Sequence, residues 1–289
     1  AVALPIHKLA LPIRSSDLRV WQDRLASFRN REKISSYLGY VHTKIPFEYF
    51  LRAGKSLFEA KDVRLLADPP EKALRRDRHN WLMQELFPLL KKTKKKLALT
   101  SPYFVPGRAG AQTLAELAQK GGDVRVLTNS LAATDVSIVH GGYAAYRKSL
   151  LKAGVKLFEL KPEGGAKHKF PLRLRSLGRA SLHTKAFLID DAIGFIGSFN
   201  FDPRSASLNT EMGILFDCPA IAIHMNIIFC EETTGEMSYE VILGRKNKIA
   251  WRSIREGKNH YFRREPESSF MRRIVAMLVR WLPAIKSQL

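Results

Sequence analysis

Four side chains of the kinds that act on phosphodiesters lie close together in the sequence. His183 and Lys185 are separated by one residue, and Ser198 and Asn200 follow directly after Gly197. In an extended segment, His183 and Lys185 would point to the same face because strand side chains alternate. Gly197 would permit a tight turn that brings the hydroxyl and the amide toward them. An imidazole can serve as nucleophile or acid/base while the other three groups bind phosphoryl oxygens, so we predict phosphodiester chemistry.

The alternation of side chains along the same segment distinguishes residues expected to react from residues expected to be structural. Phe187 and Ile189 continue the face predicted for His183, whereas Asp190 falls on the opposite face. We therefore expect Asp190 to be a structural carboxylate and Gly197 to serve the turn. The chain shows no clustered spacing of metal ligands, so we predict neither a metal nor another cofactor.

The spacing H-x-K-x4-D-x6-G-S-x-N resembles the signature of the phospholipase D superfamily. Further segments agree with that family in order along the chain: TSPYFVPG at 100–107, LTNSL at 127–131, TDV at 134–136, DPRS at 202–205 and NTEMG at 209–213. Together they resemble bacterial cardiolipin synthases of the C-type subgroup. The resemblance extends from about residue 62 to the C-terminus.

The resemblance implies a role for each residue of the motif. His183 would be the nucleophile that forms a phosphohistidine, or else the acid that protonates the leaving oxygen. Lys185, Ser198 and Asn200 would hold the phosphate, and Glu211 would accept a hydrogen bond from a catalytic histidine and fix its tautomer.

Two residues outside the motif are candidates for lining the substrate. Tyr103 lies in the loop that resembles the family's first loop. His140 lies in a predicted helix within text that matches the family, where a packing role is the alternative.

The resemblance implies two such motifs, one in each of two lobes, but this chain has one. His42-Thr43-Lys44 is followed by Tyr49 where the motif needs an aspartate, so we do not count it. We interpret residues 1–60 as a connector or the tail of a preceding lobe, and 61–289 as the lobe with the second motif. The chain begins at Ala1, and we expect it to be the C-terminal portion of a longer enzyme. The second lobe could be its own N-terminal half, another polypeptide or a second copy in a homodimer.

The charge of the chain indicates a polyanionic partner. Lys and Arg number 48 against 27 Asp and Glu, a net charge of +21. This favours an anionic membrane surface or nucleic acid. Aromatic residues are not interleaved with the basic clusters as in single-strand binding platforms. Charge does not separate these two partners, but the DPRS and NTEMG segments and the C-terminal helix with Trp281 favour anionic phospholipids over nucleic acid.

The C-terminal segment 270–282 predicts a short amphipathic helix. Arg272, Arg273 and Arg280 fall in one arc, and apolar residues with Trp281 occupy the rest. This pattern is typical of a helix lying at a membrane interface, and we predict membrane contact by these four residues. A helix that caps the domain core is the alternative. No apolar run reaches the roughly 20 residues of a membrane span, and the resemblance implies a peripheral protein on the cytoplasmic side of the bacterial inner membrane.

The periodicity upstream of the motif predicts the elements that position it. Alternating or short apolar segments predict strands, and apolar residues at helical spacing predict helices. The expected strands are 62–66, 96–100, 124–127 and 155–160, and the expected helices are 79–90, 112–119 and 139–152. This order predicts an α/β fold with a mixed sheet flanked by helices, as a phospholipase D-like lobe would have.

The resemblance implies phosphatidyl transfer between two phospholipids, with phosphatidylglycerol as acceptor and a phosphohistidine intermediate. Two alternatives remain open. The chain could be a homodimeric phosphodiesterase that cleaves nucleic acid with the same residues. It could also be an inactive membrane-binding half of an enzyme that lacks the first motif.

Overall fold

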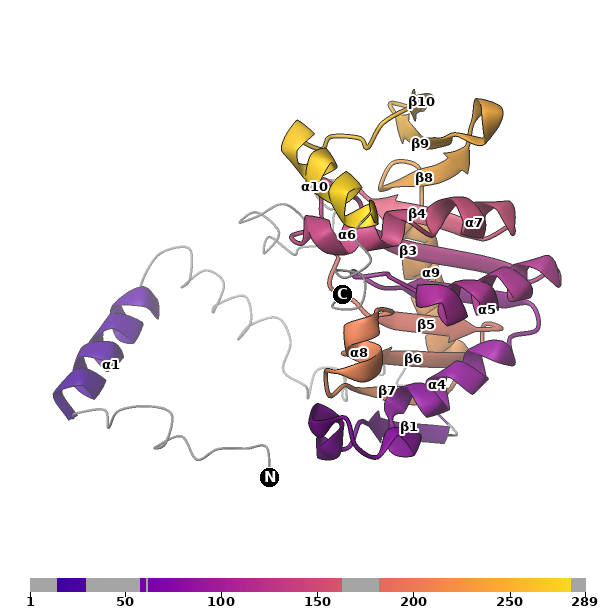
Figure 1. The fold of residues 1–289 in the computed structure, drawn as a ribbon. Coiled ribbons are helices and arrows are strands. Elements are labelled where there is room, and N and C mark those ends of the chain that lie inside the picture. The colour runs from indigo at the N-terminus through magenta and orange to yellow at the C-terminus, as the bar shows by residue number, and fades with distance from the viewer. Residues whose placement is uncertain (1–14, 30–57, 61, 163–181, 282–289) are drawn as a thin grey trace. The chain divides into compact units, whose positions relative to one another are not determined.

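The computed structural model describes residues 15–29, 58–60, 62–162 and 182–281 (Figure 1). The chain divides into two compact units, 1–59 and 60–289. The first unit contains α1 (Ser15–Arg29), and most of the predicted connector 1–60 lies outside the described residues. The second unit contains the sheet and the predicted motif.

The described residues form one ten-stranded sheet in the order β1-β7-β6-β5-β2-β3-β4-β8-β9-β10 (Figure 1). The strands are β1 (Asp62–Ala67), β2 (Lys96–Thr100), β3 (Asp123–Asn129), β4 (Lys156–Leu160), β5 (Ala186–Ile189), β6 (Ile193–Gly197), β7 (Met212–Asp217), β8 (Ser238–Leu243), β9 (Ile249–Arg255) and β10 (Lys258–Phe262). Strands β2, β3 and β4 are parallel, and the other neighbours are antiparallel. The predicted mixed sheet is confirmed.

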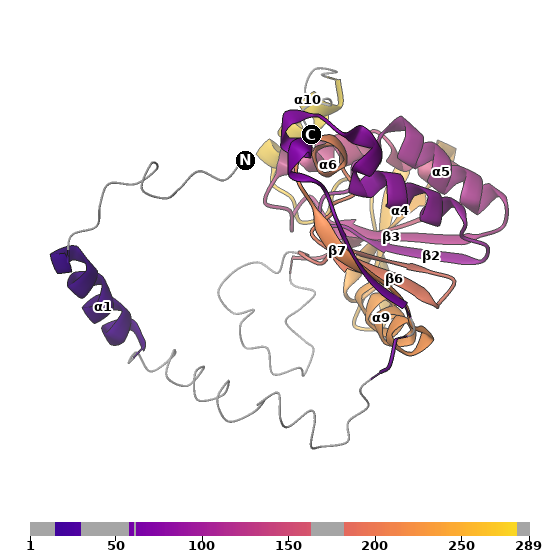
Figure 2. The same cartoon turned by 90° about the horizontal axis from the view of Figure 1, so that it is seen from below.

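Helices cover both faces of this sheet. They are α4 (Leu82–Lys91), α5 (Gly107–Gln119), α6 (Ser137–Ala144), α7 (Arg147–Lys152), α8 (Pro203–Ser207), α9 (Pro219–Glu232) and α10 (Phe270–Trp281), with short 3-10 helices η2 (Pro70–Leu74), η3 (Arg78–Asn80) and η5 (Arg245–Asn247). Helices α4 and α5 lie on one face and α9 lies on the other (Figure 2). Within the described residues, no helix has both the length and the apolar character needed to cross a bilayer.

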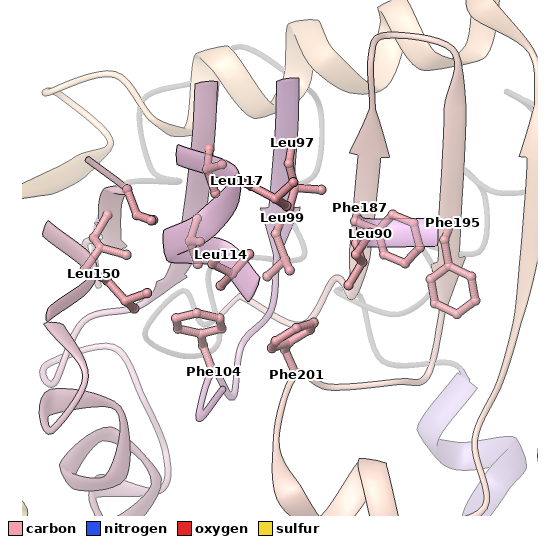
Figure 3. Packing of buried hydrophobic residues seen from close by; sticks show 14 of the residues in the cluster. Leu90, Leu97, Leu99, Phe104, Leu114, Leu117, Leu150, Phe187, Phe195 and Phe201 are labelled. Carbon is pink, nitrogen blue, oxygen red and sulfur yellow. The ribbon is translucent and has the colours of Figure 1, made fainter. Parts of the chain in front are cut away.

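The main core lies between the sheet and the helices α4, α5 and α7. Leucines from the helices meet leucines of β2 and the rings of Phe187 and Phe195 (Figure 3). These two rings stack with centroids 5.1 Å apart. Leu188, between Phe187 and Ile189, packs instead in the second core cluster with α9. The alternation predicted for Phe187 and Ile189 is therefore confirmed.

The strand β5 begins at Ala186, directly after Lys185. One sequence prediction about local structure is wrong. The helix expected over 139–152 is two helices, α6 and α7. Between them Ala145 and Tyr146 make i to i+3 hydrogen bonds, to Gly142 and Tyr143. Such tighter turns interrupt the α-helical pattern, and side-chain periodicity alone does not reveal them.

Candidate active site

The ends of three consecutive antiparallel strands bring the predicted motif together. His183 and Lys185 precede β5, and Ser198 and Asn200 follow β6. Since β5 and β6 are antiparallel neighbours, the start of one lies beside the end of the other. The backbone N–H of Gly197 donates to the carbonyl of Lys185 at 3.1 Å. The register of the sheet therefore brings together the two halves of the motif.

His183 and Lys185 differ in their exposure. His183 is exposed, whereas Lys185 is buried, and the Lys185 ammonium donates to the carbonyl oxygen of His183 at 2.8 Å. Burial lowers the pKa of Lys185, and the nearby carboxylates of Glu211, Asp202 and Asp135 partly counter this effect. The site thus holds a cation in a setting rich in carboxylates.

Glu211 comes directly before β7, which pairs with β6. Its buried carboxylate accepts a hydrogen bond from Ser198 Oγ at one oxygen and from Ser205 Oγ at the other, the latter at 2.8 Å. The N–H of Met212 donates to Ser198 Oγ at 3.0 Å. Among the described residues, no hydrogen bond joins Glu211 to His183, so the predicted histidine partner of Glu211 stays a prediction.

A fully buried ion pair hydrogen-bonds to the backbone of Glu211 and holds it in place. Lys72 Nζ lies 2.6 Å from Asp68 Oδ2, and both side chains are 0% exposed. The same Asp68 oxygen accepts the backbone N–H of Glu211 at 2.9 Å, and Lys72 Nζ also donates to the Ser205 carbonyl at 2.8 Å. Asp68 Oδ1 accepts the N–H of Leu82 at the start of α4. The pair thus connects the end of β1, α4, α8 and the start of β7.

Asn200 has an unused hydrogen-bonding atom in this region. Its backbone N–H donates to Ser205 Oγ at 3.2 Å. Its side-chain Oδ1 is buried and has no hydrogen-bond partner among the described residues. A buried polar atom of this kind is costly unless a ligand, water or another chain satisfies it.

Tyr103 and Asp202 add to the electrostatics of the site. The Tyr103 hydroxyl donates to the Asp135 carboxylate at 2.8 Å, and burial together with Asp135 raises the pKa of Tyr103 to about 12. Asp202 begins α8, where its Oδ1 accepts the N–H of Ser205 at 2.7 Å. Burial, with a contribution from the Glu211 charge, raises the pKa of Asp202 to about 6 despite these backbone hydrogen bonds.

Asp190, the acidic residue of the motif, lies at the opposite end of β5 from His183. Its carboxylate accepts three backbone N–H groups, from Lys94, Lys95 and Lys96, at 3.0, 2.8 and 2.9 Å. These bonds lower the pKa of Asp190 although burial opposes them. This residue therefore connects the β5–β6 turn to the start of β2.

Comparison with known proteins agrees with this geometry. A family model described as a cardiolipin synthase, PLD-like domain matches residues 86–232, which include the whole motif and Glu211. This chain belongs to the PLD-like cardiolipin synthase family. Cardiolipin synthase C of Escherichia coli is 37% identical over 260 residues, which cover 89% of this chain and 54% of that protein. The chain therefore spans about half the length of this relative.

Two further proteins are similar to smaller parts of the chain. Cardiolipin synthase A of Proteus mirabilis is 29% identical over 147 residues, 51% of this chain and 26% of that protein. Among solved structures, the phosphatidylserine synthase of Haemophilus influenzae matches with a TM-score of 0.48 and 16% identity, covering 78% of this chain and 46% of that one.

His140, the second substrate-lining candidate, lies in a buried ionic cluster of this PLD-like lobe. Its imidazole contacts the Arg147 guanidinium, and its Nε2 lies 3.4 Å from a Glu265 oxygen. Arg147 also pairs with Glu159 at 3.1 Å. The ligand atoms of His140, Glu159 and Glu265 have the dimensions of a metal site. The Arg147 cation pairs with both of these carboxylates, so the contacts of His140 support the packing alternative.

The helix predicted to contact the membrane is α10, and its arginines differ in their surroundings. Arg272 donates to the carbonyls of Leu131, Ala132 and Thr134 at 2.9, 3.1 and 3.0 Å. All three bonds come from Nη1, so this nitrogen faces the 131–134 loop, and the predicted contact of Arg272 with lipid stays a prediction. Arg273 donates to the carbonyls of Ser268 and Ser269, directly before its own helix. The side chains of Arg280 and Trp281 lie outside the described residues.

Several residues that shape this site were missed from the sequence. They are the ion pair Asp68–Lys72, the hydroxyl of Ser205 and the carboxyls of Asp202 and Asp135. Asp202 and Ser205 belong to the DPRS segment, and Asp135 to the TDV segment, so the family resemblance contained a signal for them. Asp68 and Lys72 lie far from the motif in sequence and showed no such signal.

A cavity of about 360 Å³ lies behind the loop that carries Asn200. Its lining is mainly apolar and comes from α4, α5 and both neighbours of Asn200: Met83, Phe87, Val105, Phe199 and Phe201, with Arg108 as a basic group. Asp202 lines the same cavity, so the cavity reaches the polar groups of the site.

Replacing Lys72 with Met should destabilise the fold strongly. Asp68 would remain buried without its counter-ion, a change that typically costs about 3–5 kcal/mol. Urea unfolding would measure it. Arg64→Met is the matched control, because the Arg64–Glu85 pair is about half exposed, with 47% and 54% of the side chains accessible. Loss of that pair should cost less than about 1 kcal/mol, and equal effects of both changes would contradict our interpretation of the buried pair.

Asp202 should make stability depend on pH between 4 and 6. Its pKa is about 6 in the folded protein against a reference value of 3.8. The folded state holds this proton more tightly, so the stabilisation is complete below the reference value and is lost as pH rises through 6. The unfolding free energy lost across this pH range is about 3 kcal/mol.

Asp202→Asn keeps a capping oxygen and removes the buried charge. The variant should therefore exceed the parent in unfolding free energy at pH 7.5, and the difference should narrow as pH falls toward 4. Chemical denaturation across this range is the measurement, and a constant difference would show that Asp202 does not titrate there.

Proposed function

We propose that this chain is the second-motif lobe of a phospholipase D-type phosphatidyltransferase that makes cardiolipin. The observation that carries the proposal is the meeting of His183, Lys185, Ser198 and Asn200 at the adjoining ends of β5 and β6. The family of the chain and its similarity to cardiolipin synthase C support the choice of reaction.

The reaction proceeds in two displacements at phosphorus. A histidine imidazole attacks the phosphodiester of a donor phospholipid and forms a P–N bond as the P–O bond to the leaving alcohol breaks. A second histidine gives that alcohol a proton. The second histidine then takes a proton from the hydroxyl of phosphatidylglycerol, whose oxygen attacks phosphorus and releases the first histidine. His183 supplies one of the two imidazoles.

The other polar groups stabilise the charge that develops on the phosphoryl oxygens. Lys185 has an ammonium with three protons, one of which is engaged with the His183 carbonyl. The Asn200 amide supplies neutral hydrogen-bond donors, and Ser198 becomes a donor to phosphate if its hydroxyl rotates away from Glu211. A donor that is already held in place, as the buried Lys185 is, stabilises such charge with little reorganisation.

The first test is product formation on vesicles of phosphatidylglycerol and phosphatidylethanolamine, measured by lipid mass spectrometry. The parent chain should make cardiolipin, alone or with a first-motif lobe added. His183→Ala should lower the rate at least a hundredfold because it removes an acid, base or nucleophile. His79→Ala is the matched control, since His79 is exposed and lies outside the motif, and it should retain the parent rate.

The outcomes separate the alternatives that the sequence left open. Product from the chain alone indicates that it completes its own site, whereas product only after a first-motif lobe is added indicates a half-enzyme. Cleavage of single-stranded DNA that depends on His183, without cardiolipin, would replace the lipid reaction with the nuclease alternative. No turnover of either substrate under both conditions would leave the non-enzymatic alternative.

The second lobe has a plausible docking surface beside the motif. Val63 and Leu65 of β1, Ile196 of β6, and Met212 and Ile214 of β7 are exposed large apolar residues. The alternation of buried and exposed positions puts them on the sheet face that α9 also covers. Ile196 and Met212 are sequence neighbours of the site residues, so this surface borders the site.

Helix α9 supports the same interpretation. It packs on the sheet through Ala222 and Phe229, yet Ile223, Ile227 and Ile228 on its other sides are exposed. Several large apolar side chains exposed together on one surface mark a site where a partner can bind. We infer that a lobe carrying another H-x-K motif covers α9 and the adjacent strands, since the cardiolipin synthase C relative is nearly twice as long as the matched segment.

Ile214→Lys should therefore abolish cardiolipin formation by preventing the two lobes from associating, with little effect on the unfolding free energy because the residue is exposed. Sedimentation of the chain, alone and mixed with a first-motif lobe, measures the association directly. Ile138→Lys, an exposed isoleucine of α6, is the matched control. Unchanged association of the Ile214 variant would show that another surface joins the lobes.

A further inference from the structure

We propose that the outer face of α10 docks this lobe onto an anionic phospholipid bilayer by inserting its apolar side chains into the interface. The choice of lipid rests on the proposed function, but docking is measured without turnover. Phe270, Met271, Met277 and Leu278 are between 52% and 71% exposed. At about 100° per residue they fall within one arc of about 120°.

The inner face of α10 is fixed against α6, so the apolar face cannot turn inward. Ala276 and Val279 are buried. The helices approach so closely at Gly141 that an added Cβ would lie 2.6 Å from the Ala276 carbonyl oxygen. Only a residue without a side chain permits this contact. Arg272 adds three hydrogen bonds to the carbonyls of the 131–134 loop.

The charges around the apolar face favour an anionic bilayer over an apolar protein partner. Helix α10 contains three arginines and no acidic residue. Arg273 flanks the exposed arc, and Arg263 and Arg264, just upstream, are exposed. Apolar side chains on one face with basic residues at the border are the pattern of helices that lie in the headgroup region of anionic membranes.

The position of α10 also connects docking to the site. The loop that holds Arg272 continues into Asp135, whose carboxylate accepts the Tyr103 hydroxyl. The Asp135 charge acts on Lys185 of the motif. A helix anchored to this loop therefore fixes the orientation of the site relative to the lipid surface.

The experiment compares two exposed apolar faces in the full chain. Flotation with phosphatidylglycerol-containing vesicles should recover the parent and His183→Ala equally, and phosphatidylcholine vesicles should recover far less. Phe270→Ser with Leu278→Ser should lower the partition at least tenfold. Ile223→Ser with Ile227→Ser on α9, where the exposed fractions are 51% and 50%, should not change it. Equal losses for both pairs, or no binding by the parent, would overturn the proposal.

A fluorescent label checks insertion directly. Cys230 on α9 is exposed and Cys218 is buried, so an environment-sensitive dye on native Cys230 is the reference. The dye on Met277→Cys in a Cys230→Ser background should shift to the blue when phosphatidylglycerol vesicles are added, while the reference stays unchanged. A blue shift without vesicles that grows with protein concentration would show that protein covers the α10 face, and would overturn the proposal.

Discussion

The buried ion pair between Asp68 and Lys72 is the interaction on which the geometry of the site depends. The two side chains connect the end of β1, the first turn of α4, α8 and the start of β7. A charge pair without solvent is favourable only when its remaining hydrogen bonds are satisfied, and here the backbone of Glu211, Leu82 and Ser205 satisfies them. The position of the Glu211 carboxylate, and through it the Ser198 hydroxyl, therefore follows from a pair that lies outside the motif.

The site concentrates opposite charges where water is scarce. Lys185 is buried near three carboxylates, and the raised pKa of Asp202 reflects the same shortage of solvent. Hydrogen-bond donors and cations gain strength in such a setting, which suits the binding of a phosphoryl group. The Oδ1 of Asn200 is buried without a hydrogen-bond partner among the described residues, so it can accept a bond from a ligand, water or another chain.

The lobe has two exposed apolar surfaces, and we propose a different partner for each. The surface on α9 and the adjoining strands borders the motif and suits a second lobe, since it exposes several large apolar side chains, including Ile223, Ile227 and Ile228. The surface on α10 is one face of a helix with basic residues beside it, and its opposite face is closed against α6. A transfer reaction between two lipids needs both kinds of contact, one to complete the catalytic groups and one to present them to the bilayer.

The sequence by itself determined the family, the mixed α/β fold and the motif residues, because their types and spacing are local information. It also predicted the alternation of Phe187 and Ile189 and the existence of the C-terminal helix. It missed the break between α6 and α7, since hydrogen-bond geometry decides where that break lies. Only the tertiary structure showed that Asp68 and Lys72 support Glu211 and that Arg272 bonds to the carbonyls of the 131–134 loop. Those contacts join segments far apart in sequence, and the packing of the sheet and its helices decides which of them form.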